Sequence, residues 1–556
     1  MLLALVAVWA VSCQEKEPQP ADAAPPASYL ELLAAYDAGK VFASAEQAAG
    51  SCKVLFSDGS AVSVPASDFA IDDCTSSTPS VVTSNGSWWV VDGIVKPMKV
   101  DSGLADGKAW PVYVYYDSET LHMHLSNRQV LSFWSLVLEE EKQKEEEEAA
   151  RLEELAKLQN LPVVRITTVG GAEIVDKENY VDGTITVADP GKLYSDVETF
   201  TADMGIRGRG NSTWGWPKKP WKVKLDKKAS VLGMPEDKEW CLLANYSDRT
   251  LMRNIVAMKL SEICGFSWTP RLCSVEVYLN DVYQGVYTFC EHKKVSSSRV
   301  NIEVIDENVT EGEALTGGYY FEIEEQQDAD VCWWTSMGVP MMFSEPETPN
   351  EAQQAYVKGL FADFEEALLG SSFADPEKGY AAYIDVESFI NFYIVQELTK
   401  NIDGNVRKSS FLTKEVGGKL EMYHLWDFDL TLGNCGYFDW RIGNGPEGFW
   451  VKDYASDSTL GGGWYQRLFE DPAFVDAVQK RWDELVPQLQ AVAQFIDDQA
   501  YVLDPAQKRN FSKWSIMESV DWVKFPSLGS YEAEVEYLKE FYTSRLQWLD
   551  TELHKL

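Results

Sequence analysis

The predicted order of strands and helices places this chain in the α+β class. From residue 163 the sequence contains alternating apolar runs that favour strands, among them VVRITTV, GTITVAD, WKVKLDK and GGYYFEIEE. After about residue 350 the apolar residues follow a helical period, as in EAQQAYVKGLFADFEEALLG and VESFINFYIVQELTKN. A strand-rich half followed by a helix-rich half indicates an α+β domain with a cleft where the two halves meet.

Length, composition and charge limit the classes of function. The chain has 556 residues, enough for two to four domains, and its 45% hydrophobic and 12% aromatic content is that of a globular protein. A formal net charge of -38 argues against an extended nucleic-acid surface, because such surfaces neutralise phosphates with Lys and Arg. We therefore expect no nucleic-acid partner, and a nucleotide site would have to be a local basic pocket.

The N-terminus has the pattern of an export signal. Residues 1–13 form a short apolar run that ends in Ala10-Val11-Ser12-Cys13, which resembles a bacterial lipobox and predicts lipidation at Cys13. An apolar run this short is typical of a signal peptide and not of a membrane span. No Lys or Arg precedes the run, which departs from the usual signal. We expect a lipoprotein on the outer membrane or cell surface, with a disordered tether over residues 14–27.

Two further regions precede the main domain. Residues 28–135 contain short alternating strands with turn signals, which predict a small β-rich module. Residues 136–161 are rich in Glu and carry one narrow apolar stripe, Leu152, Leu155 and Leu158, which indicates a solvated helical spacer. The main domain is expected over residues 162–556.

A basic, glycine-rich segment lies near the start of the main domain. In GIRGRGNSTWGWPKKPWKVKLDKK, three glycines allow tight turns and a close approach of the backbone to a ligand. Six cations fall within eighteen residues: Arg207, Arg209, Lys218, Lys219, Lys222 and Lys224. Alternation places Trp221, Val223 and Leu225 on one face of a strand and the last two lysines on the other. The segment suits a phosphate group, and the alternative is a basic hairpin paired with acidic surface elsewhere.

A polar cluster surrounds the start of the next predicted helix. Asn245, Asp248, Arg249, Arg253 and Asn254 lie within ten residues, and either Ser247 or Asp248 is expected to cap the helix. Capping explains one or two of these side chains. The rest indicate a further role.

Two acidic motifs follow in the helix-rich half. In WDFDLTLGN, alternation on a strand would place Asp427 and Asp429 on one face, as a Mg²⁺ ligand pair, and the alternative is a solvated turn after a strand. Asn401, Asp403 and Asn405 lie in a predicted loop, with Asp403 twenty-four residues before Asp427. A loop Asp, a short hairpin and a second Asp follow each other in this order in kinase-like folds.

Together these motifs resemble the CotH kinases, divergent secreted members of the protein-kinase-like superfamily. The resemblance is carried by RGRGNSTWGWPKKPWKVKLDKK, VLGMPEDKEWCLLANYSDRTLMRN, EVYLNDVYQGVYTFCEH, GGYYFEIE, QELTKNIDG and WDFDLTLGN, over roughly residues 163–550. It implies a two-lobed kinase-like fold, with a strand-rich lobe at about 162–345 and a helical lobe at about 346–556. It also implies ATP and Mg²⁺ or Mn²⁺ as cofactors, and Ser or Thr of exported proteins as substrate.

The resemblance also implies roles for individual residues. Asp403 would take the catalytic-loop role and Asp427 the metal-binding role, supported by Asp429. Lys222 or Lys224 would contact the nucleotide phosphates, within a site that also includes Arg207, Arg209 and Asn211. Ordinary kinases carry a metal-binding Asn five residues after the catalytic Asp, and here that position is Lys408. Asn405 or Asn401 is the expected substitute.

Three functions remain as alternatives. The first is a membrane-anchored kinase acting on exported proteins outside the cytoplasm. The second is a degenerate kinase fold used as a surface-binding or adhesion module, for which the β-rich module, spacer and anchor are suited. The third is a carbohydrate-active enzyme, suggested by 20 Trp and paired acids, although Asp427 and Asp429 are too close in sequence to flank a glycosidic bond. The joint presence of Asp403, Asp427 and the lysines favours the first.

Overall fold

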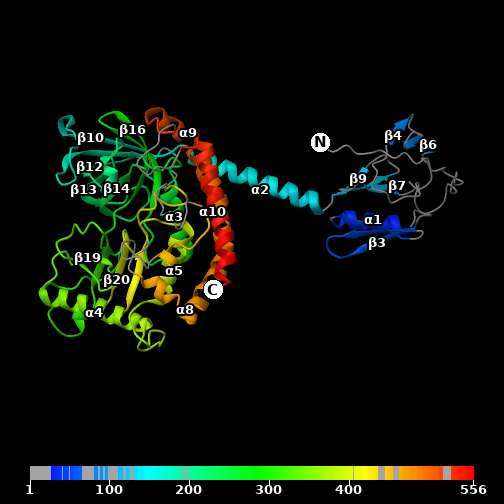
Figure 1. The fold of residues 1–556 in the computed structure, drawn as a ribbon. Coiled ribbons are helices and arrows are strands. Elements are labelled where there is room, and N and C mark those ends of the chain that lie inside the picture. Colours follow the sequence, from blue (N-terminus) through cyan, green and yellow to red (C-terminus); the bar gives the residue numbers. More distant parts are fainter. Residues whose placement is uncertain are drawn as a thin grey trace. The chain divides into compact units, whose positions relative to one another are not determined.

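The computed structural model separates the chain into two compact units, residues 1–152 and 153–556 (Figure 1). It describes residues 27–40, 42–48, 51–65, 81–84, 88–91, 94–97, 111–116, 120–125, 130–134, 136–189, 191–192, 194, 196–197, 199–404, 406–435, 445–454, 463–517 and 527–556. The predicted signal peptide, Cys13 and Asn405 lie outside the described residues. None of the described helices is both long and apolar enough to cross a membrane.

The first unit contains short antiparallel sheets. Three three-stranded sheets have the orders β1-β2-β3, β4-β5-β6 and β7-β8-β9. Their bounds are β1 (Phe42–Ala48), β2 (Ser51–Phe56), β3 (Ala61–Pro65), β4 (Val81–Ser84), β5 (Trp88–Val91), β6 (Ile94–Pro97), β7 (Pro111–Tyr116), β8 (Thr120–Leu125) and β9 (Val130–Trp134). Helix α1 (Ala27–Asp37) precedes them, and α2 (Leu136–Leu158) occupies the acidic stretch and continues into the second unit.

A closed seven-stranded barrel begins the second unit. Its order is β10-β11-β12-β13-β14-β16-β15, with β10 and β15 closing the barrel in parallel. Every second side chain of a strand points into the barrel and fills its interior. Along β13 the buried residues are Trp221, Val223 and Leu225, as the sequence predicts. The bounds are β10 (Val163–Thr168), β11 (Val181–Ala188), β12 (Thr199–Gly208), β13 (Trp221–Ala229), β14 (Asp237–Leu243), β15 (Leu272–Leu279) and β16 (Val282–Glu291). Two short 3-10 helices, η3 (Val169–Gly171) and η4 (Ser212–Gly215), lie in its loops.

A five-stranded sheet follows, in the order β18-β19-β17-β20-β21. It consists of β17 (Tyr319–Ile323), β18 (Cys332–Trp334), β19 (Pro340–Glu345), β20 (Ser410–Lys414) and β21 (Leu420–His424). Since β17 is hydrogen-bonded to both β19 and β20, the sheet spans the lobe boundary that we expected near residue 345. Strands from the helix-rich half therefore complete a sheet begun in the strand-rich half.

Helices cover this sheet and one side of the barrel. Contacts join α3 to α5, α8 and α9, α5 to β21, α9 to β16, and α10 to α5, α8 and α9 (Figure 1). An Asn350–Gln353 capping box begins α4, and Asp471 caps α8 ahead of a proline in its first turn. The bounds are α3 (Arg253–Cys264), α4 (Glu351–Leu369), α5 (Val386–Thr399), α6 (Val451–Tyr454), α7 (Trp464–Leu468), α8 (Pro472–Gln490), α9 (Val492–Lys513) and α10 (Tyr531–Leu553), with 3-10 helices η5 (Glu313–Thr316) and η6 (Tyr380–Ala382).

The α+β class is confirmed, with strands concentrated before residue 346 and helices after it. The strand-rich part is a closed barrel plus a separate sheet. A kinase-like arrangement of two lobes stays a prediction.

A buried ion pair fixes α5 against α10. Arg545 on α10 donates to a carboxylate oxygen of Glu397 on α5, and neither side chain is exposed. The same carboxylate accepts from the backbone N–H groups of Trp450, Val451 and Lys452. This network anchors the end of α5, and with it the start of the loop that carries Asp403.

Arg545→Met should lower the free energy of unfolding by about 3 to 5 kcal/mol, because it leaves the Glu397 charge buried without its partner. Chemical denaturation measures this. The control is Lys508→Met, which removes the partner of Asp504 in a pair whose two side chains are both exposed, and it should cost about 1 kcal/mol or less. Equal losses in the two variants would contradict the stabilising role of the buried pair.

Candidate phosphate and metal site

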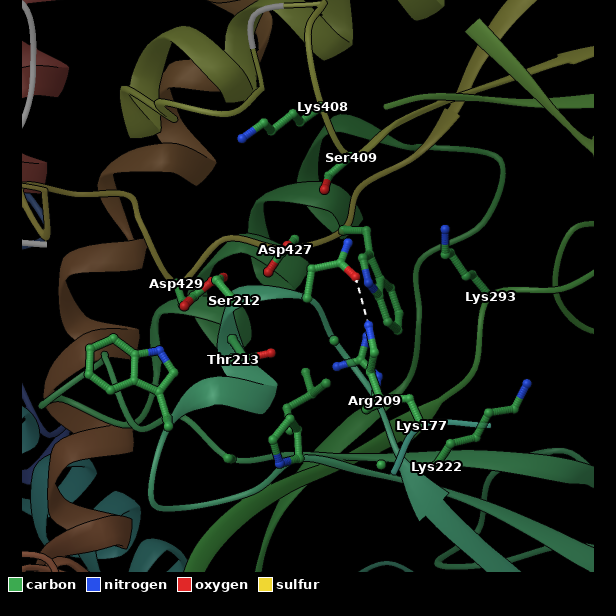
Figure 2. Close-up of a pocket in the computed structure, with 18 of the residues that line it drawn as sticks. Lys177, Arg209, Ser212, Thr213, Lys222, Lys293, Lys408, Ser409, Asp427 and Asp429 are labelled. Carbon is green, nitrogen blue, oxygen red and sulfur yellow. Dashed lines mark hydrogen bonds between the residues drawn. The ribbon is translucent and has the colours of Figure 1, made fainter. Parts of the chain in front are cut away.

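A pocket of about 500 Å³ lies among the barrel, the five-stranded sheet and the loops that follow α5 and β21 (Figure 2). It brings together most of the residues that the sequence singles out. The predicted nucleotide-binding, catalytic and metal-binding residues that line it are Arg207, Arg209, Asn211, Lys222, Asp403, Asp427 and Asp429, and Lys218, Asn245, Ser247, Asn254 and Lys408 line it as well. Lys224 is exposed on β13 and does not line it, so Lys222 is the lysine of this strand that reaches the pocket.

Asp427 and Asp429 lie in a loop and not on a strand, so that part of the prediction is wrong. Strand β21 ends at His424, and Asp427 has a φ of 66°, in the left-handed region. The buried Phe428 lies between the two acids and packs into the main core. Both carboxylates nevertheless face the same pocket. Burial and the neighbouring Asp427 charge raise the pKa of Asp429 well above its usual range.

The polar cluster around the start of α3 holds this loop in place. Ser247 Oγ donates to Asp429 Oδ2 at 2.7 Å, and the N–H of Phe428 donates to Asn254 Oδ1 at 2.8 Å. Asn434 Nδ2 donates to the carbonyls of Asp429 at 2.7 Å and Ser247 at 3.0 Å. Ser247 and Asn254 therefore bind the aspartate loop, whereas Asn245 donates to Thr288 Oγ1 and Arg249 donates to the carbonyl of Ile516.

Arg253 is the centre of this network. Its Nη1 is 2.5 Å from Asp248 Oδ1, its Nε donates to the carbonyl of Thr431 at 2.9 Å, and its Nη2 donates to that of Leu432 at 3.3 Å. Capping of α3 by Ser247 or Asp248 is not observed, since the cap position is Met252 and has no side-chain cap bond. Asp248 serves instead as the partner of Arg253, and it also accepts from the backbone N–H of that residue.

The basic side of the pocket comes from the barrel. Lys222 Nζ is 3.0 Å from Glu239 Oε2 and 2.9 Å from His292 Nε2. The Arg209 guanidinium lies 5.8 Å from the centre of the Trp426 ring. Asn211 Oδ1 accepts from Lys177 Nζ at 3.1 Å. Cations and an amide thus face the aspartate loop across the cavity (Figure 2).

Glycines allow the loop between β12 and β13 to fold back on itself. Gly210 has a φ of 78°, and a Cβ there would lie 2.0 Å from Thr213 Oγ1. A Cβ at Gly208 would lie 2.5 Å from the Trp214 ring. Larger residues at these positions would displace the segment that presents Arg209 and Asn211.

Asp403 lies in the loop between α5 and β20. Its backbone N–H donates to Asn401 Oδ1 at 3.1 Å, and its carboxylate Oδ1 is 3.8 Å from Lys408 Nζ. Burial raises the pKa of Asp403, and the Asp427 charge adds to this, while Lys408 opposes it. Asn401 is itself buried and does not line the pocket. Asn405, the other expected substitute ligand, lies outside the described residues.

Several lining residues were not predicted from the sequence. Lys177, Lys293 and Ser409 belong to no motif that spacing could identify, and Ser247 was expected only as a helix cap. Lys218 was one of the six cations, and the structure shows it buried, with Nζ 2.9 Å from Asn510 Oδ1 of α9. Burial lowers the pKa of the Lys218 amine. Only the fold shows that α9 reaches this wall of the pocket.

The donor set suits a hard divalent cation shared with a phosphorylated ligand. Within the described residues, no three His, Cys, Asp or Glu side chains form a complete metal cage. Mg²⁺, however, is usually bound by one or two carboxylates together with substrate phosphates and water. Asp427 and Asp429 supply the carboxylates, and the Arg209 and Lys222 side could hold phosphates. The arrangement can therefore bind a phosphorylated ligand with its metal ion.

Comparison with protein-family models gives a match to CotH kinase protein over residues 206–549. The match covers more than half of the chain, and the chain belongs to the CotH kinase family. A search of the curated proteins found no match. The matched region contains the basic segment, the Asp403 loop and the aspartate loop.

Asp427→Asn should raise the thermal unfolding midpoint in the absence of divalent cations. The substitution removes repulsion between two carboxylates that have no ion-pair partner among the described residues, and Asn tolerates a left-handed backbone. We expect the free energy of unfolding to rise by about 1 kcal/mol, the order of the interaction between two nearby unit charges exposed to water. The exposed Asp182→Asn is the control and should have no effect. A lowered midpoint for Asp427→Asn would show that the acids are not in electrostatic conflict.

Proposed function

We propose that this protein is an atypical Ser/Thr protein kinase of the CotH type, which transfers the γ-phosphoryl group of ATP to exported proteins with Mg²⁺ or Mn²⁺. One observation carries the proposal: a single pocket places a glycine-rich basic segment opposite three carboxylates on two separate loops. Membership of the CotH kinase family supports the same reaction class. Lipidation at Cys13, attachment to a membrane and action at the cell surface are parts of the proposal that rest on the N-terminal sequence.

Each side of the pocket has a distinct role. Lys222 and Arg209 bind the phosphates, with Arg207 and Asn211 supporting the same wall, and the Lys222 ammonium pairs with the Glu239 carboxylate at 3.0 Å. Asp427 and Asp429 would hold the divalent ion, which supplies positive charge to the phosphates when bound. Asp403 orients the acceptor hydroxyl and accepts its proton. Its raised pKa suits this role, because a carboxylate that holds a proton more tightly is a better base.

The second candidate is a binding or adhesion module built on a degenerate kinase fold. One observation favours it: position 408, where ordinary kinases carry a metal-binding Asn, is a Lys. Loss of a metal ligand is expected in a chain that no longer catalyses transfer. The two candidates differ in whether the pocket binds ATP with a metal ion.

Thermal unfolding of the full chain with ATP, with and without Mg²⁺ or Mn²⁺, tests the kinase proposal. A ligand that binds only the folded state raises the free energy of unfolding, by about 2.7 kcal/mol when its free concentration is one hundred times its Kd. The unfolding midpoint therefore rises. We expect stabilisation in the wild type that requires the metal ion and is lost in Asp427→Ala. Asp182→Ala, on the exposed part of β11, is the control and should keep the response. No response to millimolar ATP in the wild type would contradict the kinase proposal and favour the binding module.

A further inference from the structure

The loop that carries Asp403 brings a lysine to the position of a missing metal ligand. The backbone N–H of Lys408 donates to the carbonyl of Asp403 at 3.1 Å, which closes the loop. This turn directs both side chains to the same pocket, with Lys408 Nζ 3.8 Å from Asp403 Oδ1. In the close-up, Lys408 lies at the upper edge of the pocket and Lys222 at the lower right (Figure 2).

Lys408 cannot replace the usual Asn as a metal ligand. An ammonium group has three donors and no lone pair, whereas the Asn carboxamide offers a carbonyl oxygen. It does place a positive charge where a second divalent ion would lie in an ordinary kinase. Asn401 offers no substitute, because its side-chain oxygen accepts from the Asp403 N–H and the residue is buried away from the pocket.

The other contacts of Lys408 leave its ammonium able to turn toward a ligand. Its second partner is Glu325 Oε2 at 3.5 Å, a longer contact than the 3.0 Å from Arg407 Nη2 to the same oxygen. Arg407 is therefore the closer partner of Glu325, and Lys408 is the more distant one. Arg407 does not line the pocket, so of these two adjacent cations only Lys408 can reach a bound phosphate.

We propose that Lys408 takes the place of the second divalent ion and binds the terminal phosphoryl group of ATP, so that this kinase works with one metal ion per active site. The inference rests on the proposed function, since it assigns a contact within the same nucleotide site. Lys408 is then a functional replacement for the metal-binding Asn and its ion, and not a sign of lost catalysis. A cation there neutralises charge on the γ-phosphate and has no contact with ADP.

Binding measurements on the full chain separate this role from a general electrostatic one. Calorimetry with Mn²⁺ compares ADP with an ATP analogue that has a non-hydrolysable imido bridge between the β- and γ-phosphates. Lys408→Met should weaken binding of the analogue at least tenfold, as expected for loss of a charge-assisted hydrogen bond, and change the ADP affinity less than twofold. Lys224→Met, which removes an exposed cation of β13 that does not line the pocket, should change neither affinity more than twofold.

Counting the bound metal gives a second readout. Titration of free Mn²⁺ by electron paramagnetic resonance, in saturating ATP analogue, should give one ion per chain in the wild type. Two ions per chain, or equal weakening of ADP and the analogue by Lys408→Met, would overturn the role of Lys408 and leave the kinase proposal intact. A wild type that binds neither nucleotide would overturn the proposed function, and this inference with it.

Discussion

The buried ion pair between Arg253 and Asp248 is the constraint on which the site depends. Both side chains are 1% exposed, and removing two charges from water is costly unless their hydrogen bonds are satisfied. Arg253 meets that condition by bonding across to the carbonyls of Thr431 and Leu432. The pair thus ties the start of α3 to the loop that carries Asp427 and Asp429. Because Asp427 and Leu432 both have positive φ values, this loop would not keep its shape through its own backbone preferences.

The basic side of the pocket is fixed by a different kind of restraint. Lys222 and its partner Glu239 lie on β13 and β14, which are hydrogen-bonded neighbours in the barrel. In protein kinases the strand lysine that contacts the phosphates, the role proposed for Lys222, pairs with a glutamate on a helix whose position controls activity. Here the strand register sets the pair, so its formation requires no helix movement. The two charged walls of the pocket are therefore held independently, one by the barrel and the other by α3.

The sequence predicted the α+β class, and the basic segment and the aspartates of the pocket, because these have local signals. Alternation identified the buried face of β13, and short motifs identified Arg209, Asp403 and Asp427. The strand expected for Asp427 and Asp429 is a loop. An acid, an aromatic residue and an acid in alternation are typical of a half-buried strand, but a loop that buries only Phe428 gives the same pattern. The barrel closure, made by the parallel pairing of β10 with β15, joins residues more than a hundred positions apart and has no local signal. The same limit applies to Lys177 and Lys293, which only the fold brings to the pocket.

The most direct test of the central claim is a crystal structure of the full chain with Mn²⁺ and a non-hydrolysable ATP analogue, with the metal located by anomalous scattering. We expect an anomalous peak within coordination distance of Asp427, with the phosphates between that peak and the side chains of Arg209 and Lys222. A nucleotide bound elsewhere, or a metal ion that contacts neither Asp427 nor Asp429, would contradict it.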